Sequence, residues 1–458
     1  MNYRWLKYSE DDRNRIHELG ERYKDFLSCC KTERECVSFF IREAEMKGFR
    51  NIEDLIDSDY SLSPGDGIFA AGMGKTAVFF RMGRRPLTEG MNILCAHIDS
   101  PRMDLKPVPL YEDTGLAYLD THYYGGIKKY QWVTVPLALH GVIAKKDGTV
   151  VRVSIGEDDK DPVVYISDLL VHLSKDQMEK KASEVIEGEQ LDVLVGTIPL
   201  GGKEKDAVKE NVLSLLKEKY GMEEDDFISA EIEVVPAGKA RDCGLDRSMI
   251  AGYGHDDRCC AYSTFEAMLD STDIPERTVC CLYVDKEEIG SVGATGMESR
   301  FFENVLAELL ALAGSDSSLA LRRTLARSQM LSADVSAAYD PAFSQVFEKK
   351  NTPCFGKGLV INKYTGAWGK DYTNDANAEY LARVRKILDD NDVAFQMSEV
   401  GKVDAGGSGT IAFIAAMYGM DVVDAGIAVL SMHSPCEVIC KVDLYEAKKA
   451  YEAFIRHI

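Results

Sequence analysis

Short apolar runs that end in polar residues recur towards both ends of the chain. Residues 91–96, 277–283 and 425–432 are rich in apolar and β-branched side chains, which is typical of buried strands. Residues 378–389 and 444–457 repeat their apolar positions with helical spacing. This alternation of strands and helices predicts an α/β fold with a mainly parallel sheet that is flanked by helices on both faces.

The middle of the chain has a different pattern. Between residues 105 and 244, short alternating runs such as 132–143 and 149–155 dominate. These runs predict a β-rich domain that is inserted into the α/β domain. The α/β domain would therefore comprise residues 1–104 and 245–458.

Composition limits the partners and the compartment. The 458 residues carry a formal net charge of −21, which argues against nucleic acid and anionic membranes as partners. No run of about 18 apolar residues is present, so no membrane span is expected, and no signal peptide is visible. The 12 scattered cysteines include no C-x-x-C pair and indicate reduced thiols. We therefore expect a cytoplasmic protein.

One glycine-rich segment imitates a phosphate-binding loop. Gly74-Lys75-Thr76 matches the end of such a loop, but Phe69 stands where the loop needs its first glycine. The apolar run that follows has the pattern of a strand, whereas a phosphate-binding loop must open a helix. A tight turn in a hairpin is the better interpretation.

Two adjacent carboxylates follow one of the predicted strands. Glu287 and Glu288 come directly after the apolar run and before a turn of small residues. Open α/β sheets bind ligands at the carboxyl ends of their strands, and adjacent side chains point in different directions. One glutamate could thus bind a metal ion while the other takes a proton from water. A solvated acidic turn is the alternative interpretation.

A histidine and an aspartate follow another predicted strand. His97 and Asp99 come directly after residues 91–96, and Pro101 stops the strand. Residues two apart at a strand end project to the same side. This spacing is typical of a metal-ligating imidazole that a carboxylate orients, although a hydrogen-bonded core histidine is the alternative.

Asp256, Asp334 and His433 lie in similar short polar segments. Asp256 stands at a predicted helix start, where it could act as a cap or bridge two cations. With His97 and Glu288, these residues give two histidines and three carboxylates, which is a ligand set for two divalent metal ions about 3.5–4 Å apart. We expect zinc foremost, with cobalt or manganese as alternatives, because imidazole and carboxylate suit these ions.

Five motifs of the α/β domain, in this order, and two of the insert carry a resemblance to a known family. They are residues 96–102, 256–257, 285–291, 332–334 and 432–434, with 124–126 and 171–173 in the insert. Through them the chain resembles the M18 aminopeptidases, the aspartyl-aminopeptidase family of dinuclear metallopeptidases, over nearly its whole length. The implied function is a metal-dependent aminopeptidase that removes single residues from peptides with a free amino terminus. The α/β domain would be catalytic.

The resemblance also implies a division of the metal ligands. One ion would be held by His97, Asp256 and Asp334. The other would be held by Asp256, Glu288 and His433, so that Asp256 bridges the two.

Other roles follow from the same resemblance. Glu287 would be the general base that activates the attacking water and then protonates the leaving amine. Asp99 would orient His97. His172 resembles a histidine that the insert of family members sends into the site of a neighbouring subunit, whereas the residues alone favour a core or interface histidine. Family members form tetrahedral dodecamers, so we expect a homo-oligomer, a dodecamer built from dimers through the insert.

Substrate preference depends on one strand. In acidic-specific members, a lysine after the Asp334 region pairs with the carboxylate of the substrate side chain. Asn362 stands at that position here, and Lys363 follows it. Because a shift of one residue changes the face of a strand, acidic and neutral N-terminal residues such as leucine or methionine both stay open.

Two other functions use the same residues. A dinuclear deacylase or carboxypeptidase-like hydrolase would cleave N-acyl amino acids instead of peptides with a free amine. An inactive homologue would keep the fold and the metal ions as structure only. The presence of Glu287 together with all five ligand types argues against the inactive homologue.

Overall fold

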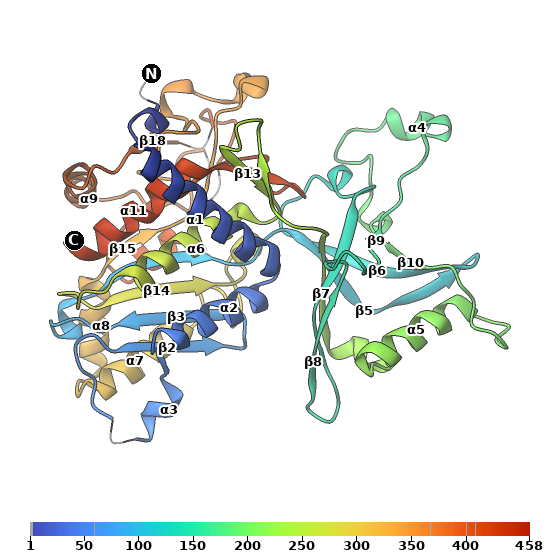
Figure 1. Ribbon diagram of the computed structural model, residues 1–458, viewed down its shortest axis with the longest axis horizontal. Helices are drawn as coiled ribbons and strands as arrows, with labels where there is room; N and C mark the ends of the chain where they lie inside the picture. The colour runs from blue at the N-terminus through green and yellow to red at the C-terminus, as the bar shows by residue number, and fades with distance from the viewer. Residues whose placement is uncertain (1–2, 59, 367, 400, 408) are drawn as a thin grey trace. The chain divides into compact units, whose positions relative to one another are not determined.

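The computed structural model describes residues 3–58, 60–366, 368–399, 401–407 and 409–458. The chain forms two compact units, and the strands and helices of each are labelled in Figure 1. Unit 1 comprises Met1–Asp99, Ala240–Met432 and Glu437–Ile458, and unit 2 comprises Ser100–Lys239 and His433–Cys436.

A nine-stranded sheet is the framework of unit 1. In spatial order its strands are β1 (Arg50–Asn51), β2 (Gly67–Gly72), β3 (Thr76–Arg81), β14 (Val279–Val284), β4 (Asn92–His97), β15 (Gln329–Ser332), β19 (Asp421–Gly426), β17 (Leu359–Asn362) and β18 (Phe395–Ser398). The central strands β14, β4, β15 and β19 run parallel. Antiparallel pairs occur at β2–β3, β3–β14 and β19–β17. The predicted α/β fold is confirmed, and its parallel part lies at the centre.

The register of the central strands determines where they end. Val284 at the end of β14 pairs with His97 at the end of β4. Cys95 of β4 pairs with Ser332 at the end of β15. The polar segments after these three strands therefore leave the sheet at the same edge.

Hydrophobic clusters cover both faces of this sheet. On β4, Leu94 and Ala96 pack into one cluster, whereas Ile93 and Cys95 pack into the other, because side chains alternate along a strand. The first cluster is completed by α1 (Glu10–Cys29), α2 (Glu33–Met46), α6 (His255–Asp270), α9 (Ala378–Asp390) and α11 (Lys441–His457). The second is completed by α3 (Glu53–Ile56), α7 (Phe301–Leu312), α8 (Ser318–Arg327) and α10 (Ala412–Ala416).

A second sheet in unit 1 divides the apolar run at residues 425–432. Its strands, in spatial order, are β12 (Arg241–Cys243), β13 (Met249–Gly252), β21 (Glu437–Cys440), β20 (Ala428–Leu430) and β16 (Ser336–Ala337). The prediction of one continuous strand was wrong, because β19 ends at Gly426 and the chain continues as β20 in the second sheet. Gly426 lies so close to another backbone segment that a Cβ there would be 1.9 Å from the carbonyl oxygen of Asp334.

Unit 2 contains a seven-stranded antiparallel sheet. In spatial order its strands are β11 (Ala230–Pro236), β5 (Arg102–Asp113), β6 (Leu116–Tyr124), β10 (Val193–Gly196), β9 (Val164–Tyr165), β7 (Pro136–Ala144) and β8 (Val150–Ile155). An additional pairing joins β11 to β7. Helices α4 (Lys175–Met178) and α5 (Ala207–Tyr220) accompany the sheet.

Several expectations about single segments can be compared with the structure. Gly74-Lys75-Thr76 spans the turn and start of β3 in the antiparallel hairpin β2–β3, so the hairpin interpretation is confirmed. All twelve cysteines are free thiols, as predicted. Among the described residues, no helix has the length and apolarity needed to cross a bilayer.

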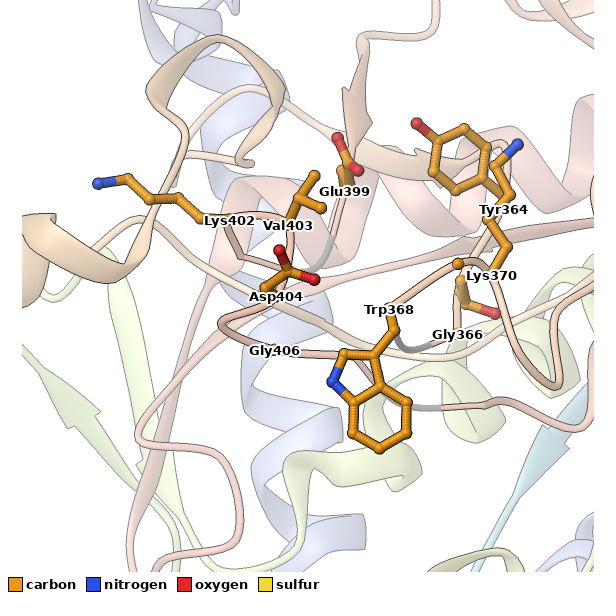
Figure 2. A pocket seen from close by; sticks show the side chains of 11 residues that line it. Tyr364, Gly366, Trp368, Lys370, Glu399, Lys402, Val403, Asp404 and Gly406 are labelled. Atoms are coloured by element: carbon orange, nitrogen blue, oxygen red, sulfur yellow. The ribbon is translucent and has the colours of Figure 1, made fainter.

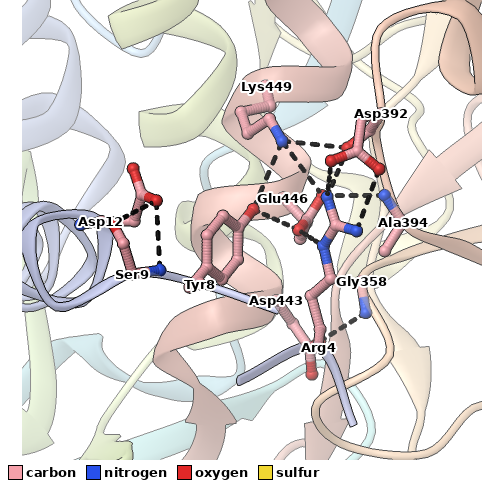
Figure 3. A network of polar contacts seen from close by, with 10 residues as sticks. All are labelled: Arg4, Tyr8, Ser9, Asp12, Gly358, Asp392, Ala394, Asp443, Glu446 and Lys449. Atoms are coloured by element: carbon pink, nitrogen blue, oxygen red, sulfur yellow. Dashed lines mark hydrogen bonds and ion pairs between the residues drawn. The ribbon is translucent and has the colours of Figure 1, made fainter. Parts of the chain in front are cut away.

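A buried polar network ties the first residues of the chain to α11 (Figure 3). The fully buried carboxylate of Glu446 accepts hydrogen bonds from the guanidinium of Arg4 and the hydroxyl of Tyr8. It also accepts the backbone N–H of Ala394 at 2.8 Å. Arg4 makes an ion pair with Asp392 at 3.0 Å as well. A carboxylate removed from water depends on such donors.

We predict that Arg4→Ala destabilises the protein by about 3 kcal/mol, because it removes the nearer cationic partner of the buried Glu446 carboxylate and leaves only Lys449, whose Nζ lies 3.8 Å away. The shift should appear as a lower urea midpoint in circular dichroism. Arg15→Ala is the matched control: it removes an exposed arginine 3.7 Å from Asp12 and should cost less than about 1 kcal/mol. Equal urea midpoints for the two variants would show that the network contributes no more to stability than the exposed contact of Arg15.

Candidate metal centre

The carboxylates of Asp256 and Asp334 lie close to the imidazole of His97. His97 is the last residue of β4 and is buried. Its Nε2 lies 3.1 Å from Oδ1 of Asp256, at the start of α6, and 4.0 Å from Oδ1 of Asp334, which follows β15. The close packing of Gly426 against the backbone of Asp334 leaves that segment little room to move.

The carboxylate of Asp99 joins β4 to the acidic turn. Its Oδ1 lies 3.2 Å from Nδ1 of His97. Its two oxygens accept the backbone N–H groups of Glu287 and Glu288, each at 3.2 Å. Lys286, just before them, has a left-handed conformation with φ of 69°, which turns the chain from β14 into the short 3-10 turn η7 (Glu287–Ile289). Asp99 is fully buried, so water does not compete for these contacts.

Two overlapping groups of candidate ligand atoms in unit 1 contain His97. His97 shares one group with Glu287 and Glu288, and the other with Asp257 and Asp334. Within each group the atoms lie within 4.8 Å of one another. Imidazole nitrogen with carboxylate oxygens is a donor set that zinc accepts, so these residues fit a divalent cation.

The charges of the cluster favour a cation. Burial opposes a charge on His97, but its hydrogen bonds with Asp256 and Asp99 raise its pKa well above the usual value. Burial raises the pKa of Glu287 to about 8, and the charge of Asp334 raises it as well, against the lowering effect of His97. A cation among these carboxylates would relieve their mutual repulsion.

Asp257 belongs to this cluster although the sequence assigned it no role. It is fully buried, and burial raises its pKa well above the usual value. One of its oxygens also lies within 4.8 Å of the thiols of Cys259 and Cys260, which are buried too. Its only signal in the sequence is its position next to Asp256.

Two other buried acids lie on neighbouring strands or just after them. Asp285 follows β14, accepts the hydroxyl of Thr295 at 2.5 Å and lies 3.1 Å from Nζ of Lys286. Asp424 lies on β19 and accepts the hydroxyl of Thr410 at 2.7 Å. Burial raises the pKa of Asp424 to about 7. In the sequence, Asp285 and Asp424 look like any other acidic residue beside an apolar run, so neither was singled out.

His433 and His172 belong to unit 2. His433 follows β20 of the second sheet and not a strand of the nine-stranded sheet, from which His97 and Asp334 come. Its Nδ1 lies 2.8 Å from the carbonyl oxygen of Gly126. His172 is exposed in a 3-10 turn and is therefore not a core histidine of this chain. The roles of both histidines stay predictions.

Asn362 and Lys363 differ in burial. Asn362 ends β17, is buried, and donates from Nδ2 to the hydroxyl of Ser336 at 2.8 Å. Lys363 is exposed. Because β17 runs antiparallel to β19 and pairs Asn362 with Asp424, Lys363 lies further from the sheet edge that carries Asp334.

The loops after β17 and β18 form a cavity of about 390 Å³ (Figure 2). Tyr364 and Trp368 come from the first loop, and Glu399 and Asp404 come from the second, as Figure 2 shows. Among the described residues, those that line this cavity and those of the acidic cluster around His97 do not overlap. The cavity therefore gives no information on the chemistry of that cluster.

Carboxylates around an imidazole at the carboxyl edge of a parallel sheet define a metallohydrolase-type site. The profile of the family described as aminopeptidase I zinc metalloprotease (M18) matches residues 26–455. The chain is 56% identical to a probable M18 family aminopeptidase 1 of Clostridium acetobutylicum, over 99% of this chain and 97% of the relative. The M18 aminopeptidase structure of Thermotoga maritima superposes with a TM-score of 0.95 and 44% identity, covering 100% of this chain and 99% of that one.

A more distant neighbour, the mApe1 dodecamer of S. cerevisiae, has a TM-score of 0.76 at 20% identity and shares the fold; the match covers 95% of this chain and 96% of that one. The chain belongs to the M18 family of zinc metallopeptidases and is a metallo-aminopeptidase. The suspected family is thus confirmed.

We predict that Asp99→Asn lowers the affinity for zinc by about 10–100-fold, because the amide cannot accept from both backbone N–H groups of the acidic turn. Competition with a chelator measures the affinity. Asp54→Asn, an exposed acid on α3, should leave it unchanged. Equal affinities in the two variants would contradict an orienting role for Asp99.

Proposed function

We propose that the chain removes single residues from peptides with a free amino terminus, using two divalent metal ions at the acidic cluster. The observation that carries this proposal is the convergence of Asp256 and Asp334 on His97, beside the turn that carries Glu287. Membership of the M18 family supports it. Zinc is the foremost candidate, and cobalt or manganese would suit the same donors.

The proposed ligands follow the family pattern. His97, Asp256 and Asp334 would hold one ion. Asp256 would bridge to a second ion on Glu288 and His433. When bound, the ions polarise the scissile carbonyl, lower the pKa of water and stabilise the negative charge that develops on oxygen.

Glu287 is the proposed general base. Its carboxylate takes a proton from the attacking water and delivers it to the nitrogen of the leaving amine. Asp99 positions this residue, because it accepts the backbone N–H of Glu287 and also contacts His97. One buried carboxylate would thus orient both a metal ligand and the base.

The acidic surroundings support a requirement for a free amine. A free α-amine would bind at the metal ions and the acidic residues beside them, whereas the nitrogen of an acetylated amine belongs to an amide and is a poor ligand. Binding of the amine beside the cluster would also limit cleavage to the first peptide bond. The deacylase function would need the opposite preference.

Neutral N-terminal residues are the proposed substrates, leucine and methionine among them. Asn362 is uncharged and already donates to Ser336, so it offers an acidic side chain no positive partner. Lys363 is exposed, and the direction of β17 takes it away from the edge that carries Asp334. These features support a neutral preference over an acidic one.

We also propose that the active form is a homo-oligomer, a dodecamer built from dimers. His172 lies in an exposed apolar segment in which Leu170, Val171 and Leu173 are 54%, 76% and 69% exposed. Such a segment is typical of an interface, and it would carry His172 to a neighbouring subunit. The dodecamer described for mApe1 of S. cerevisiae supports the proposed size.

We predict that Glu287→Gln lowers kcat by about 10²–10⁴-fold, because the amide has the same shape but cannot take a proton. Metal content and native mass should stay unchanged. The rate on a leucyl chromogenic substrate, with metal analysis of the same sample, tests this. Glu298→Gln, an exposed glutamate beyond the turn, is the control. Near-normal turnover would remove Glu287 from its role.

A substrate panel tests the preference. We predict that leucyl and methionyl substrates have a higher kcat/KM than aspartyl and glutamyl ones, and that Asn362→Lys narrows this difference by supplying a cation. Lys363→Gln should change nothing, because the exposed lysine does not reach the substrate. Each substrate is compared with its acetylated form.

Three results would contradict the proposal. Aspartyl and glutamyl substrates ahead of neutral ones by about tenfold would refute the neutral preference. Cleavage of only the acetylated set would favour the deacylase. No cleavage of either set by metal-loaded protein would favour the inactive homologue.

A further inference from the structure

Three polar side chains lie in a row on one face of the nine-stranded sheet. Ser332 at the end of β15 pairs with Asp424 on β19, and Asp424 pairs with Asn362 at the end of β17. Paired residues on neighbouring strands point to the same face, and such strands lie about 4.8 Å apart. Asp424 is therefore flanked by Ser332 on one side and by Asn362 on the other. All three residues belong to unit 1.

This row interrupts an apolar face. Met330 and Val422, two positions earlier on β15 and β19, belong to the hydrophobic cluster that α3, α7, α8 and α10 complete. Because side chains alternate along a strand, Ser332 and Asp424 point to the same side as these apolar residues. The exposed fraction is 0% for Ser332 and Asp424 and 3% for Asn362. Bulk solvent therefore does not hydrate the row.

One oxygen of each side chain lacks a hydrogen bond. Oγ of Ser332, Oδ2 of Asp424 and Oδ1 of Asn362 are buried and make no hydrogen bond of normal geometry with a described residue. The other side-chain atoms are already engaged. Oδ1 of Asp424 accepts the hydroxyl of Thr410 at 2.7 Å, and Nδ2 of Asn362 donates to Ser336 at 2.8 Å. These two bonds hold the carboxylate and the amide in place.

The row also has an unbalanced charge. No described lysine, arginine or histidine makes an ion pair with Asp424. Burial raises the pKa of its carboxyl to about 7, and the charge of Asp334 raises it too, whereas the hydroxyl groups of Thr410 and Ser332 lower it. A buried carboxylate is costly without a counter-charge. A cation beside Asp424 would supply that charge and satisfy the remaining oxygens.

We propose that this row binds a monovalent cation, sodium or potassium, through Oγ of Ser332, Oδ2 of Asp424 and Oδ1 of Asn362. One carboxylate balances one positive charge, and the hydroxyl and the amide carbonyl add neutral oxygen ligands of the kind that hard cations bind. Three oxygens without imidazole or thiolate suit zinc poorly. The site is separate from the proposed zinc ligands and does not rest on the aminopeptidase function.

The cation would hold the ends of three strands together. β15 and β17 end at Ser332 and Asn362, on either side of β19. Only Ala333 separates Ser332 from Asp334, the proposed zinc ligand. Occupancy should therefore stabilise unit 1 and also fix the start of the segment that carries Asp334.

The melting temperature of the zinc-loaded protein tests the site. It is measured at fixed pH and ionic strength in sodium, potassium or tetramethylammonium chloride, because the bulky tetramethylammonium ion cannot enter a buried site. We expect sodium or potassium to raise Tm saturably, by about 5 °C at 100 times its Kd. Equal Tm values in the three salts would overturn the proposal, because water or a proton on Asp424 would then satisfy the row.

Asp424→Asn keeps the shape of the side chain and removes its charge, so it should abolish the difference between the salts. Asp421→Asn is the matched control on the same strand. Asp421 pairs with Arg383 at 3.2 Å, outside the row, so this variant should keep the difference even if its Tm is lower. A difference that persists in Asp424→Asn would place the ion elsewhere and overturn the proposal. If Asp424→Asn does not fold, Ser332→Ala should raise the cation concentration needed for half of the shift.

Diffraction locates the ion without any variant. Thallium(I) replaces potassium and scatters anomalously, so a potassium site should give an anomalous peak between Asp424, Ser332 and Asn362. If sodium gives the larger Tm shift, distances to these oxygens that are too short for a water molecule identify it. Density with the distances and the signal of water would overturn the proposal. Neither readout needs peptide cleavage, so an inactive protein would refute the proposed function and leave the cation site intact.

Discussion

The carboxylate of Asp99 is the contact on which the rest of the centre depends. It is fully buried, and it links the end of β4 to the turn after β14 through one imidazole and two backbone N–H groups. Because the two strands are neighbours in register, a short side chain can span them. The same contact orients His97 and fixes the direction of the glutamate pair, so the ligand and the proposed base cannot shift independently.

The nine-stranded sheet of unit 1 allows the acidic residues of the centre to lie close together. Apolar side chains on both faces of the central strands exclude water, and the acids gather only where the strands end. Burial raises the pKa of Glu287 to about 8 and of Asp424 to about 7, and the charge of Asp334 adds to both shifts. Such a group of buried acids is stable with a cation and costly without one, which agrees with a family of zinc metallopeptidases.

The fold could be predicted from the sequence wherever one continuous apolar run forms one strand. The apolar runs before His97 and Glu287 are strands as expected, because buried parallel strands read as continuous apolar segments. The apolar run before His433 was wrongly predicted as one strand. Only Gly426 within this run indicates that the chain passes from one sheet to the other. Asp257 and Asp424 were not predicted either. Burial raises the pKa values of Asp257 and Asp424, and that burial depends on segments far away in the sequence, which the local sequence does not reveal.

The network at the first residues has a consequence for how the molecule is made. Arg4 and Glu446 are 442 positions apart, so Arg4 is synthesised long before its buried partner. Helix α11, which carries Glu446, also packs on α6 and β4, the elements that bear Asp256 and His97. A growing chain on the ribosome therefore lacks the cover that α11 gives to α6 and β4 until α11 itself has been synthesised. The centre can therefore be completed only after α11 has folded onto the elements that carry these two residues.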